Sequence, residues 1–297
     1  MRRMANRMPA AEVEVDAGLV RRLIAGQHPD LAGQPVRSLA NGWDNVLFRV
    51  GEQLIARMPR RELGAQIIGN EQRWLGQLGD VLPLPVPYAV RTGAPGDGYP
   101  WPWSLVPYLP GVPAFAAPDL DMEGAAVALG GFLRALHVPA PGDAPENQFR
   151  GMWIGSAWER FQANLRAACP AADIAAAERV WAAAVAVDRH PGPPVWLHGD
   201  LHPANILVHD GRVSAVIDWG DITSGDPASD LAVSWLLLPT AHHETFWAAY
   251  GAAGSDALRA RAHGWALYFA LVFLAFSADN PDMHGIGERA LPRILAL

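Results

Sequence analysis

Two short polar motifs flank a predicted β-hairpin in the second half of the chain. The first is His198-Gly199-Asp200 with Asn205 shortly after it, and the second is Asp218-Trp219-Gly220. Between Asn205 and Asp218, two runs rich in aliphatic residues enclose Asp210-Gly211, a pair typical of a tight hairpin turn. Antiparallel pairing brings the two ends of a hairpin together. The sequence therefore predicts that the side chains of Asn205 and Asp218 lie close enough to bind one cation.

Two other interpretations of this segment compete with a cation site. Asp and Asn next to a hairpin often only satisfy the backbone of the turns. His198 and His202 suit capping or zinc binding, but a zinc site needs further ligands, and the single cysteine, Cys169, lies far along the chain. The agreement between the spacing, the hairpin and the acidic residue at each end favours the cation site.

The spacing of these motifs is the one found in protein kinases: H-x-D, then four residues and N, then a hairpin and D-x-G. The form H-G-D, together with Gly225-Asp226-Pro227 and Asp230-Leu231-Ala232, resembles the aminoglycoside phosphotransferase family, which includes macrolide phosphotransferases. The resemblance extends over nearly the whole chain and is most specific between residues 196 and 232. It implies an enzyme that transfers the γ-phosphate of ATP or GTP to a hydroxyl group.

The resemblance also implies a role for each matching residue. Asp200 would orient the acceptor hydroxyl and take its proton, while Asn205 and Asp218 would bind Mg²⁺. The residues expected to support the catalytic segment structurally are His198, Asp226 and Asp230.

Further candidates for nucleotide binding lie in the first third of the chain. Arg57 stands where kinases place a phosphate-contacting Lys, and Glu71 is its expected partner, with Glu62 as the competing candidate. The hairpin Gly42-Trp43-Asp44-Asn45 either covers the phosphates or is an ordinary turn. The base is expected near the linker Pro107-Tyr108-Leu109. The sequence does not distinguish ATP from GTP.

The pattern of the remaining segments predicts a bilobal, protein-kinase-like α+β fold. Strands are expected at residues 36–39, 46–50, 54–58, 88–90 and 103–106, with one main helix at 62–78 and a short helix at 16–26. These elements would form an N-terminal nucleotide-binding lobe, residues 1–107. A larger, mostly helical lobe, residues 108–297, would carry catalysis and the acceptor, with helices at 121–137 and within 156–188.

The composition indicates which partners and which cellular compartment are to be expected. The net charge of −7 argues against nucleic acid, and all 23 basic residues are arginine. The apolar run from Trp265 to Phe276 is shorter than the roughly 20 residues that span a bilayer, so a buried helix is expected and no membrane partner. The N-terminus has arginines without a following apolar segment, and a single cysteine fits a reducing compartment, so a cytoplasmic location is expected.

The acceptor is the least constrained part of this interpretation. The acidic candidates for its binding are Glu244, Asp279, Asp282 and Glu288. An antibiotic-like acceptor, either an aminoglycoside or a macrolide, is expected, and an ordinary metabolite such as an amino alcohol or a sugar is the alternative. A nucleotide-binding protein without turnover and a protein kinase are the rival classes. The short distance from Asp218 to Asp226-Pro227 argues against a protein kinase, and the oligomeric state is open.

Overall fold

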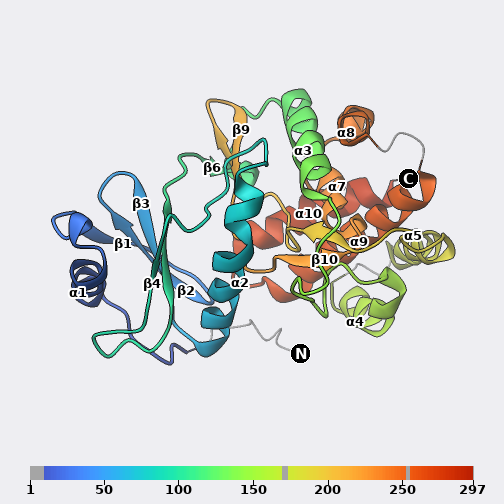
Figure 1. Cartoon of the computed structure of the whole chain (residues 1–297). Helices are drawn as coiled ribbons and strands as arrows, with labels where there is room; N and C mark the ends of the chain where they lie inside the picture. The colour runs from blue at the N-terminus through green and yellow to red at the C-terminus, as the bar shows by residue number, and fades with distance from the viewer. Residues whose placement is uncertain (1–9, 169–172, 252–254, 297) are drawn as a thin grey trace.

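The computed structural model describes residues 10–168, 173–251 and 255–296. Figure 1 shows an antiparallel sheet on one side and a larger, mostly helical part on the other, as predicted. Cys169, which argued against a zinc site and for a reducing compartment, lies outside the described residues, as does the start of the N-terminal segment.

The first sheet has five strands in the order β1-β2-β3-β5-β4. All neighbouring strands are antiparallel. Their bounds are β1 Val36–Asn41, β2 Asn45–Val50, β3 Leu54–Pro59, β4 Arg91–Gly93 and β5 Trp103–Pro107. The strand predicted at 88–90 begins instead at Arg91. The Pro-rich segment before it keeps the chain extended, and Val90 donates its N–H to Leu105 before regular pairing starts.

Two helices lie beside this sheet, and they pack against different parts of the protein. Helix α1 (Ala17–Gln27) begins at Asp16, whose side chain accepts the N–H of Leu19, and its apolar face packs on the sheet around Phe48. Helix α2 (Glu62–Gly79) instead presents Trp74 to the core of the larger part, 5.1 Å from the ring of Trp196. In Figure 1, α2 stands between the sheet and the helical part. A residue on α2 can therefore contact both parts.

Helices make up most of the second part. They are α3 Met122–Leu136, α4 Trp158–Ala168, α5 Ile174–Ala186, α6 Ala228–Leu231, α7 Val233–Leu237, α8 His243–Tyr250, α9 Asp256–Phe276 and α10 Pro281–Leu295, with short 3-10 helices at Ala114–Ala116, Ile154–Ala157 and Thr240–His242. Another 3-10 helix, Pro29–Leu31, follows α1 in the first part. The apolar run 265–276 is the C-terminal half of α9 and is mostly buried, as expected, with Phe276 exposed at its end. Among the described residues, no helix combines the length and the apolar character needed to cross a bilayer.

Two small sheets lie in the second part. Strand β6 (Val112–Pro113) pairs with β8 (Ile206–His209), which forms the predicted hairpin with β9 (Arg212–Val216). Asp210 and Gly211 have φ angles of 49° and 70°, the left-handed pair that a tight hairpin turn uses. Strand β7 (Val195–Leu197) pairs with β10 (Thr223–Gly225). The chain leaves the first sheet at Pro107 and enters this part at Val112; the exact lobe boundary stays a prediction.

Candidate active site

A cleft of about 620 Å³ lies where the two parts meet. Its lining combines the first hairpin, β3, the linker after β5 and the segment that contains Asp200 and Asp218. The predicted residues that line it are Gly42, Trp43, Asp44, Asn45, Arg57, Pro107, Tyr108, Leu109, Asp200 and Asp218. Residues that are far apart in the sequence but were assigned to one reaction therefore share one cleft.

The segment that carries Asp200 is fixed by buried hydrogen bonds. The carboxylate of Asp230, fully buried, accepts the backbone N–H of His198 at 2.7 Å and that of Gly199 at 2.9 Å. His198 donates its Nε2–H to the carbonyl of Ile217 at 3.0 Å, and its Nδ1 accepts the N–H of Asp200 at 3.2 Å. One neutral tautomer satisfies both contacts. These bonds connect Asp200 to the strand that leads to Asp218.

Gly199 is required by this geometry. Its φ angle is 86°, and a Cβ atom at this position would lie 2.2 Å from the carbonyl oxygen of Asp221. A side chain would therefore force the segment away from the residues after Asp218. The Gly of the H-G-D motif allows the two halves of the site to approach closely.

The carboxylate of Asp200 contacts two basic side chains. Its Oδ1 lies 3.2 Å from Nη2 of Arg150, and its Oδ2 lies 3.3 Å from Nε2 of His202. Burial would raise the pKa of Asp200, but the charges of His202 and Arg150 outweigh it and hold that pKa well below its usual range. Asp200 is therefore a carboxylate at neutral pH and accepts hydrogen bonds.

Asn205 connects the two acidic residues. Its Nδ2 donates to the carbonyl of Asp200 at 3.0 Å, and its own carbonyl accepts the N–H of Ile217 at 2.9 Å. Its Oδ1 has no hydrogen-bond partner among the described residues. Asp218 follows directly, with a left-handed φ angle of 62°, and its exposed side chain borders the cleft. The two side chains thus offer oxygen atoms from the two ends of the hairpin.

This donor set fits a magnesium ion that is shared with a nucleotide. Within the described ranges, no cluster of three or more His, Cys, Asp or Glu side chains forms a metal site, so the zinc alternative has no support there. Mg²⁺ prefers oxygen ligands and commonly takes only one or two from the protein, with phosphate oxygens and water as the rest. Asn205 and Asp218 can supply those two.

Arg57 and Glu71 form a buried ion pair. Nη2 of Arg57 donates to Oε1 of Glu71 at 2.8 Å, and Nη1 donates to the other carboxylate oxygen. Burial raises the pKa of Glu71 although Arg57 opposes the shift, and the charge of Asp218 adds to it. The competing candidate, Glu62, is exposed on the first turn of α2 and bonds through its backbone N–H to Glu12. The pair therefore holds the Arg57 guanidinium at the cleft.

The first hairpin is tied to the beginning of α2. The carbonyl of Asp44 accepts the N–H of Arg60 at 2.9 Å, and its carboxylate is paired with Arg61. Gly64 on α2 allows this approach, because a Cβ atom there would lie 2.5 Å from the Asp44 carbonyl oxygen. Trp43 at the tip is half exposed. The hairpin is thus fixed beside the cleft.

The linker offers few backbone donors to a base. Pro107 has no N–H, and the N–H of Tyr108 bonds to the carbonyl of Gln53 at 2.7 Å. The N–H of Leu109 has no partner among the described residues. The guanidinium of Arg49 lies over the Tyr108 ring, 3.2 Å from the ring centroid. Leu109 is therefore the linker residue that can donate to a nucleobase.

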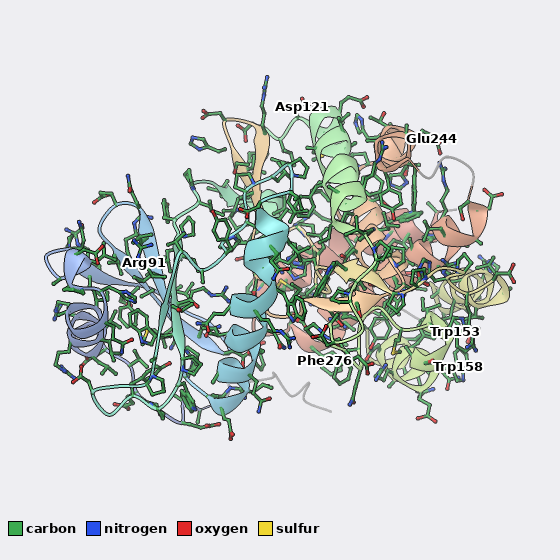
Figure 2. All side chains as sticks on the ribbon, in the orientation of Figure 1. Arg91, Asp121, Trp153, Trp158, Glu244 and Phe276 are labelled. Carbon is green, nitrogen blue, oxygen red and sulfur yellow. The ribbon has the colours of Figure 1, made fainter. Side chains whose placement is uncertain are left out.

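The four acids expected at the acceptor do not line this cleft. Glu244, on α8 at the outer edge of the helical part in Figure 2, is exposed and paired with Arg259 at 3.0 Å. Glu288 lies 3.6 Å from His284, and Asp279 and Asp282 are exposed. The placement of these residues gives no support to their assignment to the acceptor.

Sequence reasoning missed three polar residues near Asp200. Arg150 and His202 contact its carboxylate directly, and Asp221 lines the cleft beside it. Burial and the charge of Asp200 raise the pKa of Asp221, whose carboxylate accepts a hydrogen bond from Asn147 at 2.8 Å. Asp221 follows the D-x-G motif directly and could have been found there, whereas nothing local in the Pro-rich loop points to Arg150.

A family model described as "Phosphotransferase enzyme family" matches residues 35–265. The chain therefore belongs to this family of phosphotransferases. It is similar in structure to the GDP and kanamycin complex of APH(2")-IIia, with 20% identity, 93% of this chain and 98% of that chain covered, and a TM-score of 0.68. It is also similar to the macrolide 2'-phosphotransferase MphH from Brachybacterium faecium, with 26% identity, 94% and 98% covered, and a TM-score of 0.64. The predicted kinase-like fold is confirmed.

A shorter match concerns an uncharacterized protein, YcbJ, of Bacillus subtilis strain 168. The two sequences are 43% identical over 44 residues, and this match spans only 14% of each chain. It adds a relative in one segment and says nothing about the remainder of the chain.

Proposed function

We propose that the protein transfers the γ-phosphate of ATP or GTP to a hydroxyl group of a small, antibiotic-like acceptor. One observation carries this proposal: Asp200 and Asp218 border the same cleft, and Asn205 is hydrogen-bonded to the backbone of Asp200 and of Ile217, the residue before Asp218. This arrangement supports a role for Asp200 in orienting the acceptor and roles for Asn205 and Asp218 as oxygen ligands of a nucleotide-bound cation. Membership of a phosphotransferase family agrees with it.

In the proposed reaction, the acceptor oxygen attacks the γ-phosphorus while the bond to the bridging oxygen of the β-phosphate breaks. A nucleoside diphosphate leaves, and Asp200 holds and then accepts the proton of the hydroxyl group. The low pKa of Asp200 makes it a weak base, so its main contribution is to orient the hydroxyl group. Arg57, held by Glu71, would contact the phosphates of the nucleotide.

Asn205 and Asp218 would hold Mg²⁺. When bound, the ion would neutralise negative charge on the phosphate oxygens. The hairpin at residues 42–45 would cover the phosphates, and Leu109 would donate its backbone N–H to the base. Because adenine and guanine can each accept a hydrogen bond from one such donor, either nucleotide fits.

The proposed acceptor is an aminoglycoside or a macrolide, since the structural relatives include a kanamycin complex and a macrolide phosphotransferase. A protein acceptor is disfavoured, because β10 follows Asp218 almost at once and pairs with β7, which leaves no long activation segment. An ordinary metabolite acceptor and nucleotide binding without turnover are the outcomes against which the proposal is tested.

The test is a panel of aminoglycosides, macrolides, amino alcohols and sugars, each with ATP and with GTP. Nucleoside diphosphate release and the mass of the product are measured with and without Mg²⁺. We expect Asp200→Ala and Asp218→Ala to lower turnover by roughly 10³-fold or more, with unchanged circular dichroism. Asp210→Asn, at the tip of the hairpin, is the control and should keep full activity. Near-normal turnover in either of the first two variants would contradict the assignment.

A further inference from the structure

Arg150 contacts the candidate catalytic carboxylate from outside the nucleotide cleft. It lies in the loop between α3 and the 3-10 helix at Ile154–Ala157, and its Nη2 is 3.2 Å from Oδ1 of Asp200. Arg150 is not among the residues that line the cleft. Arg150 therefore contacts Asp200 without lining the cleft proposed to bind the nucleotide.

The guanidinium of Arg150 is held in place by several contacts. It lies over the ring of Phe269, 4.6 Å from the centroid, and its Nη1 donates to the carbonyl of Phe149 at 3.2 Å. The side chain is only 15% exposed. Phe269 lies in α9, a long helix with a fully buried core face. The position of the cation is thus set by a rigid element.

The same loop makes a second contact with the acidic site. Asn147 donates its Nδ2–H to Oδ1 of Asp221 at 2.8 Å, and its own side-chain oxygen accepts the N–H of Phe149. Two side chains of one loop therefore reach two carboxylates that border the cleft. Such a pair of contacts fixes the loop relative to Asp200 more firmly than one ion pair alone.

The opposite oxygen of Asp200 is held by His202. Nε2 of His202 lies 3.3 Å from Oδ2 of Asp200, and its Nδ1 lies 3.2 Å from the backbone nitrogen of Ala204. With Arg150 at Oδ1, each carboxylate oxygen has one basic partner. A carboxylate oxygen has a further lone pair, so it can still accept the hydroxyl group of an acceptor.

We propose that Arg150 is a positioning residue of the phosphotransfer reaction, which together with His202 fixes the plane of the Asp200 carboxylate so that an acceptor hydroxyl group meets it in one orientation. This inference rests on the proposed function. Reactions of this kind depend on alignment, and a displacement of about 1 Å can cost about 10²-fold in rate. The loop before α4 thereby contributes to catalysis without contacting the nucleotide.

The experiment compares Arg150→Gln with the matched variant Arg160→Gln, using the acceptor that the wild-type protein phosphorylates. Arg160 also lies over a ring, that of Phe149 at 5.0 Å, and donates to the carbonyl of Gln148, but it does not contact Asp200. We expect Arg150→Gln to lower kcat by about 10- to 100-fold, with the KM for the nucleotide changed less than about twofold. Arg160→Gln should leave both constants near the wild-type values.

Two further variants separate positioning from a general structural role. Arg150→Lys should restore part of kcat, because it keeps the charge without the planar group. Arg150→Ala should be activated by guanidinium ion at millimolar concentration, which can occupy the space left over the Phe269 ring, while Arg160→Ala should not respond. A merely structural defect would not be relieved by the added ion.

Several outcomes would overturn the inference. One is a wild-type protein that phosphorylates its acceptor while Arg150→Gln and Arg160→Gln have the same kcat. Another is a loss in Arg150→Gln that comes with an equal rise in nucleotide KM, a lower melting temperature and no response of Arg150→Ala to guanidinium. By contrast, no product from the wild type with any acceptor would refute the proposed function itself, and the role of Arg150 with it.

Discussion

Replacement of Asp230 tests whether a buried carboxylate holds the catalytic segment in place. Asp230 has no solvent exposure and accepts two backbone N–H groups, from His198 at 2.7 Å and from Gly199 at 2.9 Å. Hydrogen bonds to a charged group contribute about 1.5–3 kcal/mol each. Asp230→Ala removes both, so the free energy of unfolding should fall by about 3–6 kcal/mol.

The variant Asp230→Asn isolates part of this effect. The amide keeps one oxygen that can accept an N–H, but its NH2 group then faces the other N–H donor. We expect a loss of about 1.5–3 kcal/mol, which corresponds to one charge-assisted bond. Urea denaturation followed by circular dichroism measures the unfolding free energy, and the acceptor assay measures kcat. Because Asp200 follows Gly199 directly, we expect kcat to fall about tenfold or more in the fraction that remains folded.

The control is the same atom exchange at an exposed helix cap. Asp16 accepts the N–H of Leu19 at 2.7 Å, and Asn caps helices about as well as Asp. Asp16→Asn should therefore change neither stability nor kcat appreciably. If Asp230→Asn behaved like Asp16→Asn, the two backbone bonds would not be holding the catalytic segment, and the reasoning would fail.

The remaining predictions concern the buried ion pair and the imidazoles of His243 and His263. Glu71→Ala leaves Arg57 buried without its partner, so we expect a loss of about 3–5 kcal/mol in unfolding free energy and at least about a tenfold rise in nucleotide KM, measured by urea denaturation and initial rates. Burial lowers the pKa of His243 and His263 below the usual 6.5, so the folded state favours neutral rings. Stability should be complete above pH 6.5 and fall as the pH drops below it, by up to about 1.4 kcal/mol per pH unit for each ring, while His263→Gln should flatten this dependence.

The sequence predicted those parts of the fold that local patterns determine. The hairpin at Asp210-Gly211 was foreseen because a single pair of residues decides the local backbone. The strand expected at 88–90 was misplaced. Its position depends on where β5 can pair with it, and that is a property of the sheet and not of the segment.

In the site, too, only the residues that stand in local sequence patterns were predictable. Asp200, Asn205 and Asp218 stand in a short, regular pattern, and Glu71 is the acid of α2 that faces Arg57. Arg150 is fifty residues before Asp200, in a loop without periodicity, so only the folded structure shows the contact. Acids such as Glu244 were selected by residue type alone. In the structure, Glu244 forms an ion pair with Arg259 at the surface.

The pairing of β10 with β7 has a consequence for regulation. Thr223, two residues after the cleft residue Asp221, is fully buried and donates its hydroxyl group to the carbonyl of Pro145 at 2.8 Å. Related kinases are switched on when a long stretch at this point becomes ordered after modification. Here that stretch is a three-residue strand that pairs with β7. Among the described residues, the chain therefore has no long segment at this point that could become ordered in that way.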